Sequence, residues 1–107
     1  MTMLWGNRSR VQLLLLALTV TSPFALAERS GDAIYVKHCA VCHDDGVAGA
    51  QILGDATAWQ SLKAKGLDAL VQSTKVSITA MPPMGTCMDC TDDELTRTVQ
   101  YMIEASQ

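Results

Sequence analysis

The sequence lacks an apolar run long enough to span a membrane. Its most apolar stretch, residues 11–20, covers about 10 residues, whereas a spanning helix needs roughly 20. Arg8 and Arg10 precede this stretch, and Ala25-Leu26-Ala27 supplies the small residues at which signal peptidases cut. This order predicts a secretory signal peptide at residues 1–27, with an uncleaved anchor as the alternative. No cysteine follows the cut directly, which argues against a lipoprotein.

Positive charge is also scarce. The chain has 8 basic and 11 acidic residues, and two of the basic ones, Arg8 and Arg10, belong to the predicted signal. The remaining residues 28–107 therefore carry 6 basic and 11 acidic side chains, a net charge of −5. This balance argues against nucleic acid as a partner. We expect an exported, periplasmic protein with no membrane span after cleavage.

The exported part is short, and it offers few groups for acid–base chemistry. Removing 27 of the 107 residues leaves 80, near the size at which a hydrophobic core alone supplies only a few kcal/mol. The only histidines are His38 and His43, and the sequence shows no acid–base pair, nucleophile, repeat or low-complexity tract. We therefore expect one domain, residues 28–107, that is not an enzyme. All four cysteines lie in it, where oxidation is permitted.

Caps and apolar spacing predict an all-α domain of about four helices. The first is expected from residue 31 to about residue 39, with Ser30 or Asp32 as its cap. Asp55 can cap a second helix, and Gly66 separates it from a third, whose apolar residues follow i, i+3, i+4, i+7 spacing.

The last helix has the strongest local signal. Thr91 and Glu94 form a capping box, and an apolar face recurs at residues 95, 99, 102 and 103. Two loops, residues 44–54 and 76–90, connect the helices, and only residues 76–78 suggest an extended segment.

Cys39-Ala40-Val41-Cys42-His43 is the motif with the clearest chemistry. The C-x-x-C-H pattern is typical of covalent haem attachment. Two thiols at this spacing can form thioethers with the two vinyl groups, and the following histidine then lies under the iron. A structural disulfide or a redox-active C-x-x-C remains the alternative, although the latter would need strands around a βαβ unit.

An electron-carrying haem needs a second strong axial ligand. His38 directly precedes Cys39, so the chain cannot bring it to the opposite face of the haem. Met81 and Met84 are the candidates, although a methionine more often fills a core. A thioether raises the reduction potential. Met81 precedes Pro82, which holds it extended and favours it as the ligand.

Cys87 and Cys90 form a second C-x-x-C. Together with Cys39 and Cys42 they could make a four-cysteine zinc site, since paired C-x-x-C units are typical of zinc proteins. We favour a local disulfide, which would attach the Met81 loop to the start of the last helix.

The assembled chain resembles the class I c-type cytochromes, most closely the small bacterial cytochrome c-five group. The segments that carry the resemblance are Gly31–His43, Gly54–Trp59, Ala80–Leu95 and Tyr101–Ile103. The resemblance implies a small all-α fold around one haem c held by Cys39 and Cys42. It also implies axial ligation by His43 and Met81, pairing of Cys87 with Cys90, and contact of Gly31 and Tyr35 with the last helix near Tyr101.

Three positions depart from the family pattern. Gln51 stands where a proline is usual, Met84 stands where lysine is common, and residues 75–79 lack the expected glycines. The resemblance still implies transfer of single electrons between redox proteins, such as a membrane-bound donor and a terminal oxidase or reductase. The alternative is a haem protein with a displaceable methionine, acting as a small-ligand sensor or catalytic subunit.

Overall fold

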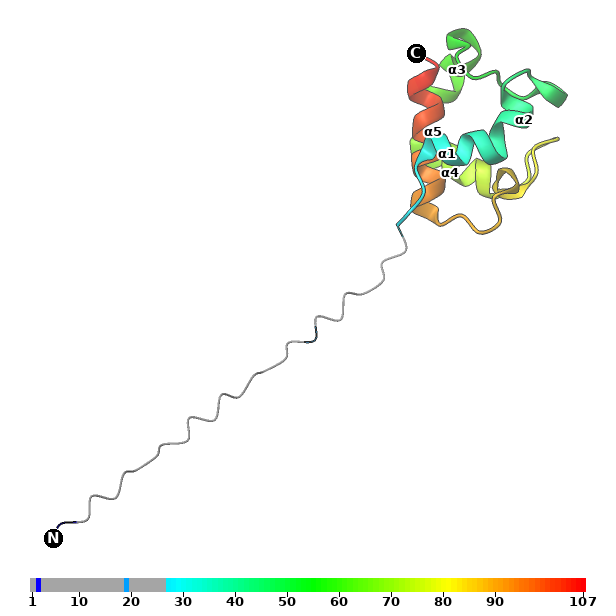
Figure 1. The fold of residues 1–107 in the computed structure, drawn as a ribbon. Coiled ribbons are helices and arrows are strands. Elements are labelled where there is room, and N and C mark those ends of the chain that lie inside the picture. Colours follow the sequence, from blue (N-terminus) through cyan, green and yellow to red (C-terminus); the bar gives the residue numbers. More distant parts are fainter. Residues whose placement is uncertain (1, 3–18, 20–26) are drawn as a thin grey trace.

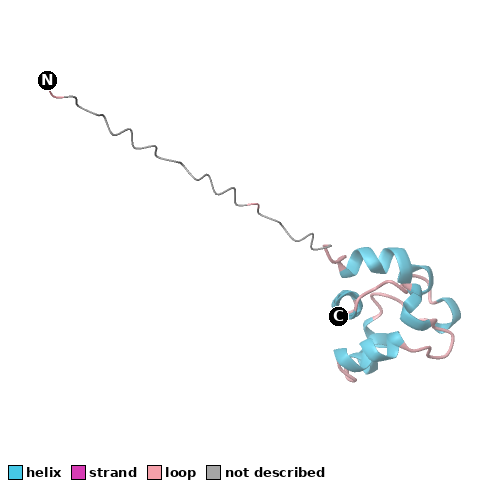
Figure 2. Cartoon of the chain, turned by 90° about the horizontal axis from the view of Figure 1, so that it is seen from below, coloured by secondary structure: helices cyan, strands magenta, loops and turns pink. Residues whose placement is uncertain are grey.

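The computed structural model describes residue 2, residue 19 and residues 27–107. The predicted signal peptide therefore lies outside the described residues, apart from residues 2, 19 and 27. The described part is built from helices and connecting loops, as Figures 1 and 2 show. It contains no strand, and only an isolated bridge joins Ile78 to Met81. The all-α prediction is confirmed, but the suggested extended segment at 76–78 is not a strand. Within the described ranges, no helix is sufficiently long and apolar to cross a membrane.

The first helical segment is longer than predicted. It begins as α1 (Gly31–Ile34), passes through the π-helical stretch η1 (Tyr35–Cys39), and continues as α2 (Ala40–His43). Ser30 is its N-cap residue, although the Ser30 side chain makes no capping hydrogen bond. The predicted end near residue 39 was wrong, because the backbone stays helical through the whole cysteine motif. The motif is therefore held on a helix end and not in a loop.

Helices α3 (Ala56–Lys63) and α4 (Leu67–Lys75) agree with the predicted caps. The Asp55 carboxylate accepts hydrogen bonds from the backbone N–H groups of Thr57 and Ala58, each at 3.1 Å. Gly66 separates the two helices with a φ of +88°, a conformation that glycine adopts without the steric cost of a Cβ atom.

Helix α5 (Asp92–Ala105) begins at the predicted capping box. The Thr91 hydroxyl accepts from the Glu94 backbone N–H at 3.1 Å, and the Glu94 carboxylate accepts from the Thr91 N–H at 3.0 Å. The apolar face of α5 is buried at Leu95, Val99 and Met102, as its spacing predicts.

Helix α1 crosses α5 at very short range. A Cβ atom on Gly31 would lie 2.3 Å from the Arg97 carbonyl oxygen, so only glycine fits at this crossing. Beside it, the Tyr35 and Tyr101 rings pack with centroids 5.5 Å apart. The contact of Gly31 and Tyr35 with the last helix is thus confirmed. In Figure 1, α1 lies against α5, whereas α2 lies away from α5.

The buried side chains form two groups. The first joins α1, α4, α5 and the 76–90 loop, and consists of Ile34, Leu70, Val71, Cys87, Cys90, Leu95 and Val99. The second consists of Tyr35, Trp59 and Met102. Members of both groups line one common cavity, which is where the sequence-predicted site residues meet.

Candidate haem site

Cys39 and Cys42 are free thiols, both half-buried, at the end of the first helical segment. Burial, and to a lesser extent the neighbouring Cys42, raises the pKa of the Cys39 thiol to about 11. Cys39 is therefore held as a protonated thiol at neutral pH and not as a thiolate. The alternative of a Cys39–Cys42 disulfide is not what the structure shows.

His43 is buried at 8% exposure and oriented by the backbone. Its Nδ1 lies 2.7 Å from the Gln51 carbonyl oxygen, which can accept the Nδ1 proton. That bond selects the tautomer in which Nε2 keeps its lone pair, as a metal-ligating histidine requires. The hydrogen-bond acceptor is thus the backbone carbonyl of Gln51. In the family, the carbonyl of a proline usually has this role. The side chain at position 51 is not needed for this contact.

The loop after His43 is held by hydrogen bonds at both ends. The Leu53 N–H donates to the His43 carbonyl at 2.8 Å, and the Trp59 indole N–H donates to the Ile52 carbonyl at 2.9 Å. The buried Tyr35 hydroxyl donates to the Asp44 carboxylate, next to His43. Burial and this contact raise the pKa of Tyr35. These bonds fix the loop without the rigidity of a proline.

A cavity of about 310 Å³ brings the predicted site residues together. Cys39, Cys42, His43, Met81 and Met84 all line it. Its apolar walls are completed by Ile34, Trp59, Leu70, Leu95, Val99 and Met102. The volume is in the range of ligand and cofactor pockets. Two free thiols, an oriented imidazole and a thioether around apolar walls fit a covalently bound haem.

Met81 enters the cavity from the loop between α4 and α5. Its backbone N–H donates to the Ile78 carbonyl at 3.0 Å, and Pro82 continues in an extended conformation. A Cβ atom built on Gly85 would lie 3.6 Å from the Met81 methyl carbon and 3.9 Å from the Cys39 sulfur. The Met81 thioether and the Cys39 thiol therefore lie close to the same glycine.

Met84 differs from Met81 in its backbone and packing. It lies in the short helix η3 (Pro83–Thr86) with a φ of +59°, and its side chain packs against the core group around Ile34. Both methionines line the cavity, but Met84 is also part of the core. The residue that replaces the common lysine thus has a packing role of its own.

Left-handed backbone conformations accumulate in the Met81 loop. Thr79, Met84 and Thr86 have φ values of +53°, +59° and +70°, although none is a glycine. Such conformations are unfavourable for β-branched residues. Thr79 is the last of residues 75–79, the stretch that lacks the glycines usual in the family. The sequence contains no signal that marks these three residues as left-handed.

Cys87 and Cys90 are joined by a disulfide, with their Cα atoms 5.4 Å apart. Both are buried, at 1% and 8% exposure, in the core group. The disulfide connects the end of the Met81 loop to the start of α5. The four-cysteine zinc site does not form, because these two cysteines are bonded to each other while Cys39 and Cys42 stay free.

Comparison with known proteins gives the same family. Residues 26–102 match a family model described as cytochrome C oxidase, cbb3-type, subunit III. The chain is 47% identical to cytochrome c5 of Ectopseudomonas mendocina over 76 residues, covering 69% of this chain and 87% of that protein.

Two solved structures share the fold. One is a chain from the crystal structure of an electron transfer complex of nitrite reductase with cytochrome c, at a TM-score of 0.70 and 39% identity. The match covers 72% of this chain and 94% of the chain in that complex. The other is a mono-heme ferrocytochrome c from Shewanella putrefaciens, at a TM-score of 0.67 and 42% identity, covering 75% and 99%. The chain therefore belongs to the class I c-type cytochromes, small electron carriers with one covalently bound haem c, and is similar to cytochrome c5.

Proposed function

We propose that this cytochrome transfers single electrons between redox proteins in the periplasm, with His43 and Met81 as the axial ligands of its haem iron. One observation carries the proposal. The cavity that holds both free thiols is lined by His43 and by Met81, which come from loops and helices far apart in the sequence.

Each site residue then has a distinct role. Cys39 and Cys42 would hold haem c through thioether bonds, and His43 would bind the iron through Nε2 while Gln51 keeps the ring in place. Bound haem supplies reversible one-electron chemistry, which the protein tunes and shields. Met81 would close the second axial position. With both positions filled by the chain, the site has no place for a substrate.

Charge and exposed apolar groups support short-lived docking. The mature chain has a net charge of −5, which favours a partner with a basic surface and transfer rates that fall as salt rises. Val41 and Val47, at the cavity, are 75% and 50% exposed. Small, weakly buried contacts suit redox encounters that must dissociate quickly. We propose a membrane-bound donor and a terminal oxidase or reductase as the classes of partner.

The ligand assignment is tested by a pair of variants. Met81→Ala should remove the methionine–iron absorption feature, lower the potential and open the ferrous iron to carbon monoxide. Met84→Lys should leave the spectrum unchanged, because lysine is common at this position in the family and Met81 stays in place as the ligand. Absorption spectra and redox titration of both purified holoproteins are the measurements.

Two results would contradict this assignment. If Met84→Lys alone opens the iron to carbon monoxide, Met84 is the ligand. If Met81→Ala keeps a methionine-ligated spectrum, Met84 can replace Met81. The second result would favour the alternative function, a protein whose methionine is displaced by a small ligand.

A further inference from the structure

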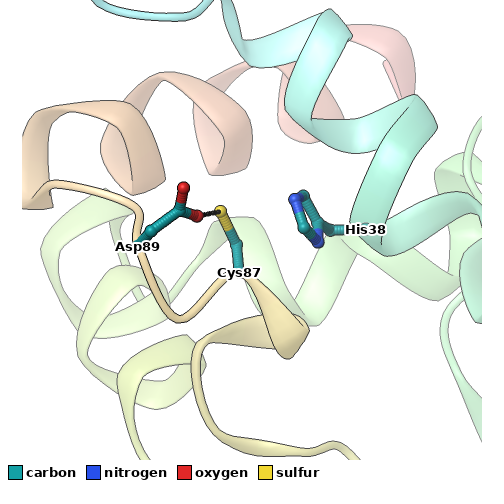
Figure 3. Close-up of side chains that lie close together, drawn as sticks. All are labelled: His38, Cys87 and Asp89. Carbon is teal, nitrogen blue, oxygen red and sulfur yellow. Dashed lines mark hydrogen bonds between the residues drawn. The ribbon is translucent and has the colours of Figure 1, made fainter.

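A cluster of potential metal ligands lies beside the haem cavity, and one member, His38, also lines that cavity. His38, Cys87 and Asp89 each offer a ligand atom, and these atoms all lie within 4.8 Å of one another (Figure 3). His38 comes from the first helical segment, whereas Cys87 and Asp89 come from the disulfide loop before α5. The fold thus brings together ligands that are about 50 residues apart in the sequence.

His38 is prepared to act as a ligand. Its Nε2 atom is buried, and among the described residues it has no hydrogen-bond partner. Its other ring nitrogen, Nδ1, lies 3.4 Å from the Thr86 hydroxyl. An Nδ1–H group that donates to Thr86 leaves the lone pair on Nε2. This is the arrangement of metal-ligating histidines, whose second nitrogen is held by a neighbouring group.

The disulfide keeps the two strongest potential ligands, the Cys87 and Cys90 thiolates, from binding a metal. A disulfide sulfur binds metal poorly, whereas two thiolates in C-x-x-C spacing are a common half of a zinc site. Reduction by a dithiol or a phosphine adds two electrons and two protons and converts the bond into two thiols. Asp89 lies between these two cysteines in the sequence. The donor set would then be two sulfurs, one imidazole nitrogen and one carboxylate oxygen.

We propose that reduction of the Cys87–Cys90 disulfide creates a Zn²⁺ site formed by Cys87, Cys90, His38 and Asp89. Four ligands of these types match the tetrahedral preference of zinc. The two thiols would release their protons to the solvent as the ion binds. This site differs from a four-cysteine site, because Cys39 and Cys42 take no part in it.

The charges near the cluster support the proposal. The Arg29 guanidinium lies 3.4 Å from the Asp89 carboxylate and 3.7 Å from the Cys90 sulfur. Two thiolates, one carboxylate and Zn²⁺ would sum to −1, next to the ion pair of Arg29 and Glu94. The shorter contact of Arg29, 2.7 Å, is to Glu94, so the Asp89 carboxylate is not committed to a strong ion pair. Its side chain is 78% exposed and is free to turn toward a bound ion.

The test is zinc binding by the haem-loaded protein in its two disulfide states. The reduced form is prepared with a phosphine, and the phosphine is then removed under anaerobic conditions. Zn²⁺ binding is measured by competition with a fluorescent chelator. We expect one tightly bound zinc per reduced protein, protection of two thiols from alkylation, and no such binding by the oxidised form. Prior alkylation of the reduced thiols should abolish binding. The haem spectrum serves as the check that each sample is folded.

Variants separate this site from simple chelation by a dithiol. His38→Gln and Asp89→Asn should each weaken zinc binding by tenfold or more, and Thr86→Val by about tenfold through loss of the orienting contact. Asp93→Asn, which removes a nearby exposed carboxylate, is the matched control and should have no effect. Equal binding by oxidised and reduced protein, absence of binding by reduced protein, or binding unaffected by both His38→Gln and Asp89→Asn would each overturn the proposal.

Discussion

The two sides of the haem cavity are built in opposite ways. The side that carries Cys39, Cys42 and His43 is one continuous helical segment followed by a loop with firm hydrogen bonds. The side that carries Met81 is a loop with three non-glycine residues at positive φ, closed by a disulfide. The first side is fixed mainly by helical backbone and loop hydrogen bonds, and its loop has one non-glycine residue at positive φ, Ala48. The second depends on a covalent bond and on packing against α4 and α5.

This difference shows which parts of a site can tolerate sequence change. On the helical side, Gln51 replaces the usual proline without loss of the acceptor, because a backbone carbonyl does the work. On the loop side, residues 75–79 lack the glycines usual in the family, and Thr79 adopts a left-handed conformation that costs free energy. We therefore expect substitutions on the helical side to act on haem attachment, and substitutions on the loop side to act on ligation and stability.

The largest effect is expected from the two haem-motif cysteines. Replacing both Cys39 and Cys42 by serine should abolish covalent attachment, because no other free cysteine lies in the described residues. The measurement is haem colour on a denaturing gel together with the mass of the purified chain. Met81→Ala is the control from the loop side and should keep its haem. Colourless wild-type protein made with a working maturation system would contradict the proposed site.

Gly31→Ala should have the next largest effect. The new Cβ atom would lie 2.3 Å from the Arg97 carbonyl oxygen, so α1 and α5 must move apart. We expect a loss of unfolding free energy at the upper end of overpacking effects, about 3 kcal/mol. Denaturant unfolding of the holoprotein measures it. Ala33→Ser, a change at an exposed position on the same helix, is the control and should change the free energy of unfolding by less than about 0.5 kcal/mol. Equal losses for the two variants would show that the crossing is not tight.

Replacing Cys87 and Cys90 by serine tests the loop side. The disulfide closes a short loop, so its loss should cost about 2 kcal/mol, the low end of the usual range. Haem should stay attached, while ligation by Met81 becomes weaker. Thermal unfolding and the methionine–iron absorption feature are the measurements.

The pairing itself is tested on the wild-type holoprotein. After denaturation without a reductant, it should show no free thiol. Two reactive thiols would contradict the pairing.

The smallest effect is expected from the contact between the chain start and α5. Hydrogen bonds from the Arg29 side chain, and then from the Arg29 and Thr91 backbone N–H groups, lower the pKa of Glu94 from 4.5 to about 2. A lowered carboxyl pKa stabilises the fold above pH 4.5, and this contribution is lost as the pH falls toward 2.

Denaturant unfolding of wild type and Glu94→Gln measures this dependence. The variant should be less stable at neutral pH and should lose less stability than wild type between pH 4.5 and 2. Glu104→Gln, a change of an exposed carboxylate on the same helix, should keep the wild-type pH dependence. Parallel curves for wild type and Glu94→Gln would show that Glu94 does not titrate with folding.

Local signals in the sequence predicted most of the helical framework. Asp55 and the pair Thr91 and Glu94 cap their helices through side chains only two or three residues away. Such contacts depend on spacing alone, so the sequence reveals them. The C-x-x-C-H motif is equally local, and its two cysteines and His43 all line one cavity.

Contacts between distant segments could not be predicted in the same way. The π-helical stretch η1 carries the helix through Cys39, and its Tyr35 ring packs against Tyr101 of α5, a contact that the local sequence does not reveal. The left-handed conformations of Met84 and Thr86 lie beside the disulfide, and the Met84 side chain packs against the core. The approach of His38 to Cys87 follows from the folded loop, because the sequence shows only that His38 precedes the haem motif.

Carbon monoxide added to the reduced wild-type holoprotein tests the central claim most directly. An electron carrier with both axial positions filled by His43 and Met81 should keep its reduced absorption spectrum unchanged over the time in which it exchanges electrons. A rapid and complete spectral change would show that the methionine is easily displaced. That result would contradict the account of a closed electron-transfer site and favour a sensor or catalytic subunit.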